Sequence, residues 1–227
     1  MPDNDPGIYT TGFPVFDDIF GPMISGDLHL IVGRTRLNHD LVDRTAVLAA
    51  SRGDSVYYID GGHGADPFSM ARVLRMQRKD PRSVLERIMI ARAFTAYQMD
   101  SLIREGVRSL QEPPDLLIIS SLDSLFSDPE VDIREAKGMM RNCMTVLRET
   151  ADRGACVLIS AVGGGRESEL LALMSPVCSN WASLAKRSGN RVRIVTRGGR
   201  WRDLVPLHPF QTMIEDYSSR GSTEEAA

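Results

Sequence analysis

A short apolar run that ends at a glycine and leads into an amphipathic segment constrains the fold of this chain most strongly. Residues 28–32 have the sequence LHLIV and precede Gly33, and apolar residues recur at helical spacing over residues 41–50. A buried strand followed closely by a helix is the repeating unit of parallel α/β sheets. Similar apolar runs of strand length recur along the chain, at residues 55–60, 87–91, 116–120 and 156–161. The sequence therefore predicts an α/β fold with a mostly parallel central sheet flanked by helices.

The remaining patterns complete this prediction. Helical periodicity occupies residues 66–76, 96–110 and 134–153. Residues 181–187 and 191–196 instead alternate between apolar and polar, and Ser188, Gly189 and Asn190 between them favour a turn. This predicts an antiparallel C-terminal hairpin at the edge of the sheet. We expect one core domain at residues 10–215, between a short flexible leader at 1–9 and a disordered tail at 216–227.

Composition excludes several classes of function. The 227 residues carry a net charge of -3, which gives no overall attraction to nucleic acid or to a membrane surface. The three cysteines are odd in number and far apart, which argues against a disulfide framework or a zinc site. Neither a signal peptide nor an apolar run of roughly 18 residues is present in the sequence. We therefore expect a cytoplasmic protein without a membrane partner.

The segment after Gly33 has the spacing of a phosphate-binding loop but not its chemistry. The motif G-x-x-x-x-G-K-[ST] would place its second glycine, lysine and hydroxyl at residues 38, 39 and 40, where the chain has Asn38, His39 and Asp40. A histidine is mostly neutral at pH 7 and shorter than lysine, and an aspartate is negative where a hydroxyl would ligate magnesium. The sequence therefore predicts a degenerate loop.

Two arginines and the histidine of this loop allow more than one interpretation. Arg34 and Arg36 could replace the charge of the missing lysine, or they could be two exposed arginines on a surface loop. His39 could be a weak phosphate donor or a metal ligand, but a lone histidine at a helix start is more often simply solvated. A bound metal is not expected.

A run of basic residues begins within the predicted hairpin and extends past its end. Within seventeen residues, and with no acidic residue among them, the chain has Lys186, Arg187, Arg191, Arg193, Arg197, Arg200 and Arg202. Phosphate contacts from such a patch would give salt-sensitive binding of single-stranded DNA, and Trp201 could stack on a base or a guanidinium. The other interpretation is a solvated edge hairpin whose charges prevent edge-to-edge pairing.

Five segments, in order along the chain, resemble those of one superfamily. They are TTGFPVFDDIFGPMISGDLHLIVG (10–33), SVYYIDGGHG (55–64), RIMIARAFTAYQM (87–99), LLIISSLDSLF (116–126) and ACVLISAV (155–162). Together they resemble the RecA superfamily, specifically the ATPase core of the archaeal RadA recombinase and its shorter RadB-type paralogs, with KaiC-like proteins as more distant relatives. The resemblance implies a RecA-like P-loop NTPase fold.

The resemblance also implies which groups have been lost. The Walker B aspartate of the superfamily corresponds to Ser120, the catalytic glutamate to Gly62, and the glutamine that senses the γ-phosphate falls near Val162. Phosphoryl transfer depends on positioning and on charge neutralisation by lysine and metal. The resemblance therefore implies no catalytic residue, no ATPase activity and no resident cofactor, with ATP and magnesium bound at most weakly.

Three functions follow as expectations. The first is a pseudo-ATPase that assists DNA recombination or repair by binding a RadA-type recombinase or another RecA-like ATPase, single-stranded DNA, or both. The second is a divergent KaiC-like regulator that still binds ATP through Arg34, Arg36 and His39. The third is a protein-binding scaffold with no nucleic-acid role. The sequence does not specify the partner, the pathway or the oligomeric state.

Overall fold

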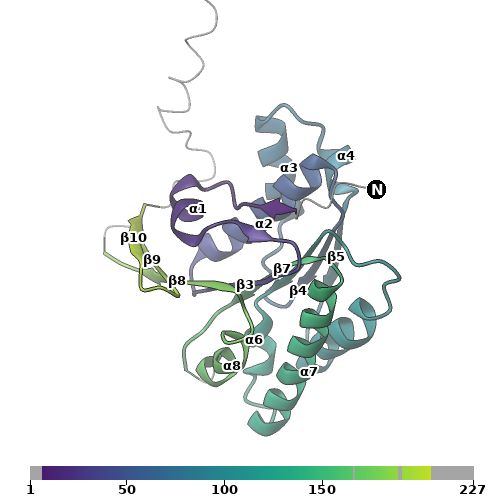
Figure 1. Cartoon of the computed structure of the whole chain (residues 1–227), viewed down its shortest axis with the longest axis vertical. Coiled ribbons are helices and arrows are strands. Elements are labelled where there is room, and N and C mark those ends of the chain that lie inside the picture. The colour runs from purple at the N-terminus through teal and green to yellow at the C-terminus, as the bar shows by residue number, and fades with distance from the viewer. Residues whose placement is uncertain (1–6, 166, 189–190, 206–227) are drawn as a thin grey trace, which may run out of the picture.

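A single eight-stranded sheet organises the chain (Figure 1). The structure is a computed structural model that describes residues 7–165, 167–188 and 191–205. The strand order is β10-β9-β8-β3-β7-β6-β4-β5, with β3 to β8 parallel and β9 and β10 antiparallel to their neighbours. The strands are β3 (Leu28–Val32), β4 (Val56–Asp60), β5 (Ile88–Arg92), β6 (Leu116–Ser120), β7 (Cys156–Ala161), β8 (Asn180–Lys186), β9 (Val192–Thr196) and β10 (Trp201–Leu204). The predicted fold class is confirmed.

Helices cover both faces of the sheet, as Figure 1 shows with α3 and α4 on one side and α7 and α8 on the other. The first face carries α1 (Pro14–Phe20), α2 (Arg36–Arg52), α3 (Pro67–Met76) and α4 (Pro81–Leu85). The second carries α5 (Ala96–Ser101), the π-helix η1 (Leu102–Val107), α6 (Leu122–Phe126), α7 (Ile133–Asp152) and α8 (Glu167–Met174). Leu30 faces one layer and the adjacent Ile31 faces the other. Burial on both faces explains why the central strands are continuously apolar in sequence.

The core begins earlier than the sequence predicts. The strand β1 (Ile8–Tyr9) pairs with β2 (Met23–Ile24), so the end of the expected flexible leader is part of the fold. Tyr9 is buried, and its hydroxyl donates to the carbonyl oxygen of Asp115 at 3.1 Å. Residues 1–6, the predicted tail at 216–227 and residues 189–190 of the predicted turn lie outside the described residues.

Most element boundaries agree with the periodicity, and the exceptions are informative. The carboxylate of Asp66 accepts from the amides of Phe68 and Ser69 and so caps α3 where the sequence predicts its start. The helix predicted at 96–110 changes from α to π geometry at Leu102. The strand β10 is missing from the prediction, because its four residues, WRDL, do not alternate between apolar and polar. The largest difference concerns α2, which begins at Arg36 instead of residue 41.

Candidate functional site

The carboxyl ends of β3, β4 and β6 meet beside the start of α2, and this is where ligands bind in open α/β sheets. The structure brings together the predicted residues at this edge. His39 on α2 lies against Gly62, which follows β4, and Gly62 in turn lies against Ser121, the residue after Ser120. His39 and Gly62, two of the candidate residues from the sequence, therefore lie side by side at this edge of the sheet.

The connection after β3 is too short to be an open phosphate-binding loop. Only Gly33, Arg34 and Thr35 separate β3 from α2, so Arg36, Asn38, His39 and Asp40 are helical. A phosphate cradle requires successive backbone N–H groups that point into an empty loop. Here the amide of Asn38 already donates to the carbonyl of Thr35 at 3.0 Å. The interpretation that places Arg36 on a surface loop is thus wrong, because Arg36 is the first residue of α2.

The side chain of Asn38 fills the space behind this connection. Asn38 is only 3% exposed. Its amide nitrogen donates to the carbonyl of Gly33 at 3.0 Å and to the carbonyl of Ala161 at 3.1 Å. Asn38 therefore ties the end of β3 to the end of β7 with the side chain that replaces a glycine of the motif.

His39 closes the site from the other side. A Cβ atom at Gly64 would lie 2.9 Å from His39 Cγ and closer still to Nδ1, so the imidazole occupies the space beside this glycine. A Cβ atom at Gly62 would overlap Ser121 and would lie 3.6 Å from His39 Cε1, which is an ordinary contact. The interpretation of His39 as merely solvated is wrong, because its ring is half-buried against the glycine loop. No metal-ligand cluster of three or more His, Cys, Asp or Glu occurs among the residues that the structure describes.

Arg34 of the connection and Arg36 at the start of α2 each lie close to a carboxylate. Arg34 makes an ion pair with Glu167 on α8 at 2.8 Å and donates to the carbonyl of Gly163 at 3.0 Å. Arg36 lies 3.9 Å from Asp40 on the same helix and is largely exposed. The charge of Arg34 is therefore offset by a carboxylate and directed at α8.

Asp60, at the end of β4, shapes the glycine loop. This fully buried carboxylate accepts from the amides of Gly62, Gly64 and Ala65 at 3.1 to 3.2 Å, and it pairs with Arg92 at 3.1 Å. With all these partners, Asp60 acts as a structural anchor of the loop.

Ser120 and Gly62 leave little room for catalytic acids. Ser120 is fully buried, and its hydroxyl lies 3.5 Å from the hydroxyl of Ser160. A Cβ atom at Gly62 would lie 2.7 Å from the Cβ atom of Ser121. A carboxylate at residue 62 would therefore require Ser121 to move.

Two carboxylates near this edge escaped the sequence analysis. Asp123 on α6 accepts from the amides of Val162 and Gly163 at 2.7 and 2.8 Å, and burial raises its pKa. The carboxylate of Asp43 on α2 accepts from the hydroxyl of Tyr58 at 3.0 Å, and burial raises its pKa to about 7. Asp123 could have been found from the sequence, because it is an acidic residue three positions after the end of β6. Asp43 gave no comparable signal, because its partner is distant in sequence.

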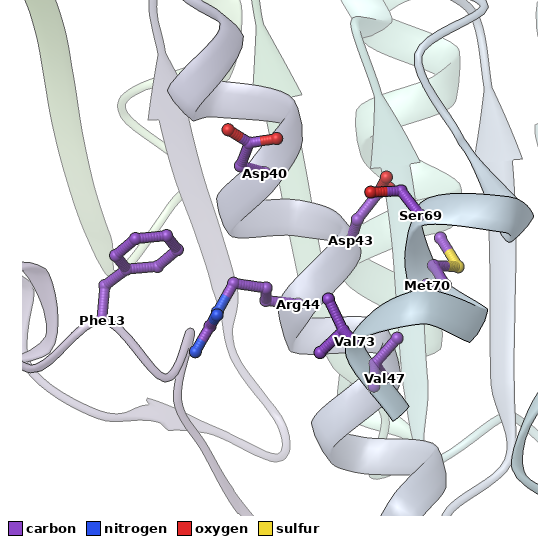
Figure 2. Close-up of a pocket in the computed structure, with 8 residues that line it drawn as sticks. All are labelled: Phe13, Asp40, Asp43, Arg44, Val47, Ser69, Met70 and Val73. Atoms are coloured by element: carbon purple, nitrogen blue, oxygen red, sulfur yellow. The ribbon is translucent and has the colours of Figure 1, made fainter. Parts of the chain in front are cut away.

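Asp43 also lines a narrow pocket between α2 and α3 (Figure 2). Arg44 extends toward Phe13 on one side, and Asp43 points toward Ser69 on the other. The guanidinium of Arg44 lies 4.5 Å from the centre of the Phe13 ring. The volume is about 30 Å³, which is room for little more than one water molecule. This pocket is a packing gap and not a ligand site.

The predicted basic patch is partly neutralised. Arg193 makes a two-point ion pair with Asp203 at 2.7 and 2.9 Å, and its guanidinium lies 4.2 Å from the centre of the Trp201 ring. Arg202 pairs with Asp18 at 2.7 Å. Further arginines donate to backbone carbonyls: Arg197 to Cys178 and Arg200 to Asp18.

The basic residues nearest the hairpin turn, unlike Arg193 and Arg202, have no carboxylate partner among the described residues. Lys186, Arg187 and Arg191 make no ion pair with any residue that the structure describes. The hypothesis of a DNA-binding hairpin thus narrows to these three side chains and remains a prediction.

Two further observations concern the chain more widely. Across residues 7–165, 167–188 and 191–205, no helix is long and apolar enough to cross a membrane. All three cysteines are free and buried, and burial raises their pKa values, so their thiols are not reactive.

Sequence comparison gives a partial match to known proteins. No protein-family profile matches the chain. The chain is 29% identical over 126 residues to the meiotic recombination protein DMC1 homolog of Arabidopsis thaliana, which covers 52% of this chain and 37% of that protein. The DMC1 homolog of Glycine max is also 29% identical over 126 residues, with 52% and 36% covered. The match thus spans just over a third of each relative. Together with the fold, it supports placing the chain in the RecA superfamily.

Proposed function

We propose that this chain is a RecA-like protein of DNA recombination that does not hydrolyse ATP and acts by binding a partner recombinase. The observation that carries this proposal is the closed connection after β3, where Asn38 and His39 fill the space of a phosphate-binding loop. A triphosphate would have to displace two packed side chains and approach the negative charge of Asp40.

The chemistry of phosphoryl transfer adds to this argument. Hydrolysis requires a cation on the phosphates, an acid that holds magnesium and a group that orients the attacking water. The corresponding positions hold His39, Ser120 and Gly62. Because these groups act together in the transition state, the loss of all three removes the electrostatic stabilisation on which the reaction depends.

The recombination role rests on similarity and on surface charge. Both relatives are named meiotic recombination proteins, and the matched segment covers about half of this chain. A RecA-like domain without hydrolysis can still contribute a docking surface to a RadA-type recombinase. Lys186, Arg187 and Arg191 offer a small cationic surface for single-stranded DNA in the same assembly.

A second candidate function is a nucleotide-binding regulator of the KaiC type. Three buried side-chain atoms around the closed connection have no hydrogen-bond partner among the residues that the structure describes: Thr35 Oγ1, Asn38 Oδ1 and His39 Nδ1. An unpaired buried polar atom costs about 1–3 kcal/mol, so a polar ligand that reached these atoms would gain that energy back. This observation favours some remaining affinity for a polar ligand at the site.

Equilibrium binding of ATP distinguishes the two candidates. The purified chain is titrated with ATP, with and without magnesium, and phosphate release is followed in the same sample. We expect neither binding at millimolar ATP nor turnover. Submicromolar affinity that depends on magnesium, or any turnover, would reject the pseudo-ATPase and favour the regulator.

The variant Asn38→Gly/His39→Lys/Asp40→Thr makes this test more specific. It restores the motif and removes the side chains that close the connection. We expect nucleotide affinity to rise while turnover stays absent, because Ser120 and Gly62 are unchanged. If affinity does not rise, the three side chains are not what excludes the nucleotide.

The accessory role is tested separately, with a RadA-type recombinase. Association is measured by sedimentation, and the ATPase and strand-exchange rates of the recombinase are compared with and without this chain. We expect a complex and a changed rate. The absence of both would leave the accessory role without support, whatever the result with ATP.

A further inference from the structure

A second cavity lies at the opposite end of α2 from the closed connection. It has a volume of about 160 Å³ and is lined by Tyr9, Thr10, Thr45, Leu48, Ala49, Ser51, Arg52 and Lys79. Ser51 follows Asn38 by thirteen residues on α2, which corresponds to about 20 Å along the helix axis. This cavity is therefore separate from the nucleotide position.

Its polar lining is cationic and rich in donors. Arg52 donates to the carbonyl of Ile8 at 2.6 Å and pairs with Asp54 at 2.8 Å, which leaves most of its five N–H groups available. Lys79 is exposed and makes no ion pair within the described part of the chain. Two cations against one carboxylate leave a net positive charge at the cavity.

One side chain in this cavity lacks a partner. The hydroxyl of Ser51 is buried and makes no hydrogen bond within the described structure. Buried hydroxyls normally find a partner, and an unpaired one is a reason to look for a missing ligand or water. The hydroxyl of Thr45 is already used, because it donates to the carbonyl of Leu41 at 2.8 Å.

The rest of the wall is apolar. Leu48, Ala49 and the ring of Tyr9 form this side, and the guanidinium of Arg52 lies 4.9 Å from the centre of the Tyr9 ring. The hydroxyl of Tyr9 points away to Asp115, so the ring contributes only its apolar surface. A volume of about 150 Å³ is known to hold a benzene-sized group.

From this lining we propose that the cavity binds a small organic oxyanion. Its phosphoryl or carboxylate group lies against Lys79 and Arg52 and reaches the hydroxyl of Ser51 once that side chain rotates toward the cavity. A compact apolar body packs against Leu48 and Tyr9. The carboxyl end of α2 carries a partial negative charge, which opposes anion binding and limits the affinity of a minimal probe to the millimolar range.

The test uses the full chain labelled with ¹⁵N and three probes: inorganic phosphate, phenyl phosphate and benzoate. We expect saturable shifts of the Ser51, Arg52 and Lys79 amide signals, with the two aromatic probes binding more tightly than inorganic phosphate. The comparison of phenyl phosphate with benzoate decides between phosphoryl and carboxylate recognition. No shift of these amides at tens of millimolar probe would reject the site.

Variants separate recognition from general charge effects. Lys79→Gln and Ser51→Ala should each weaken phenyl phosphate binding about tenfold, as expected for the loss of one hydrogen bond to a charged group. Arg75→Gln removes an exposed charge from α3 nearby but does not touch the cavity, so its affinity should be unchanged. Equal loss in all three variants would mean non-specific attraction and would overturn the proposal.

Stability provides an independent control. Ser51→Ala deletes an unpaired buried hydroxyl, so without ligand the variant should be at least as stable as the wild type. A lower affinity of a variant that is no less stable then reports on binding and not on folding. If Ser51→Ala binds phenyl phosphate as tightly as the wild type, the unpaired hydroxyl has only a water molecule as its partner and the proposal fails.

Discussion

The imidazole of His39 packs directly against Gly64, in the space that a side chain at residue 64 would need. This contact joins the first turns of α2 to the loop after β4, two segments that border the site of phosphate chemistry in a P-loop protein. The contact forms because His39 is bulky and Gly64 has no side chain. The closed site therefore depends on both residues together.

Gly64→Ala tests this packing. The new methyl group would overlap the imidazole, so we expect the free energy of unfolding to fall by about 1–3 kcal/mol. In the background of His39→Ala the same substitution should cost much less, because the overlapping ring is gone. Urea denaturation of the wild type, both single variants and the double variant gives the coupling energy.

Gly138→Ala is the matched control for this cycle. Gly138 lies on α7 with open space around its Cα, so alanine there should stabilise the protein by up to about 1 kcal/mol through helix propensity. Additive effects of Gly64→Ala and His39→Ala would show that the two residues are not in contact in solution.

The sequence predicts the fold well because the central strands are apolar on both faces. The runs that contain Ile31, Ile59 and Ile118 are buried between two helical layers, which is where parallel sheets place continuously apolar strands. Spacing also selects Asn38 and His39 as candidate site residues. It does not give their geometry, because Asn38 and His39 are held by Ala161 and Gly64, which are distant in sequence.

The hairpin shows the same limitation for charge. The basic run contains no acid, yet the carboxylate that neutralises Arg193 stands just beyond it at Asp203. Only the register of β9 with β10 places the two residues opposite each other. Asp18, the partner of Arg202, comes from α1 at the other end of the chain. The sequence alone therefore overestimates the net positive charge of this patch, because strand pairing and packing place carboxylates beside its arginines.

Asp43 makes stability depend on pH. Burial raises its pKa from 3.8 to about 7, so the folded chain holds the proton more tightly than the unfolded chain does. The free energy of unfolding of the wild type is therefore highest, as far as Asp43 is concerned, below about pH 4. It falls as the pH rises toward 7, because the unfolded chain releases this proton first. We expect Asp43→Asn to gain roughly 1–3 kcal/mol relative to the wild type between pH 5 and pH 8. Urea denaturation at intervals of one pH unit measures this gain.

Glu112→Gln provides the comparison for Asp43→Asn. Glu112 is exposed in the connection before β6, so its substitution removes one carboxylate without removing a buried one. Its stability difference from the wild type should be constant over the same pH range. A constant difference for Asp43→Asn as well would contradict the raised pKa.

Asp123 fixes the end of β7 by accepting two backbone hydrogen bonds. Asp123→Ala leaves the amides of Val162 and Gly163 buried without an acceptor, and we expect a loss of about 2–4 kcal/mol in the free energy of unfolding. Asp123→Asn should also destabilise, because only one of its terminal atoms can accept. Ser124→Ala, at the next position on α6, serves as the control and should change stability little. Hydrogen exchange at the amide of Gly163 should accelerate in both Asp123 variants and not in Ser124→Ala.

The hairpin contains basic residues that could contact phosphates and others that make ion pairs within the fold, and variants can test the two sets separately. If Lys186, Arg187 and Arg191 contact phosphates, changing all three to Gln should lower the affinity for single-stranded DNA. It should also reduce the salt dependence of binding by about 2, since each contact contributes about 0.7 to the slope. Fluorescence anisotropy with a labelled oligonucleotide at several salt concentrations measures both quantities. The double variant Arg193→Gln/Asp203→Asn removes an equal number of opposite charges, so its slope should match that of the wild type. A slope that changes in the double variant but not in the triple variant would place the DNA contact at Arg193 on β9 and exclude the turn.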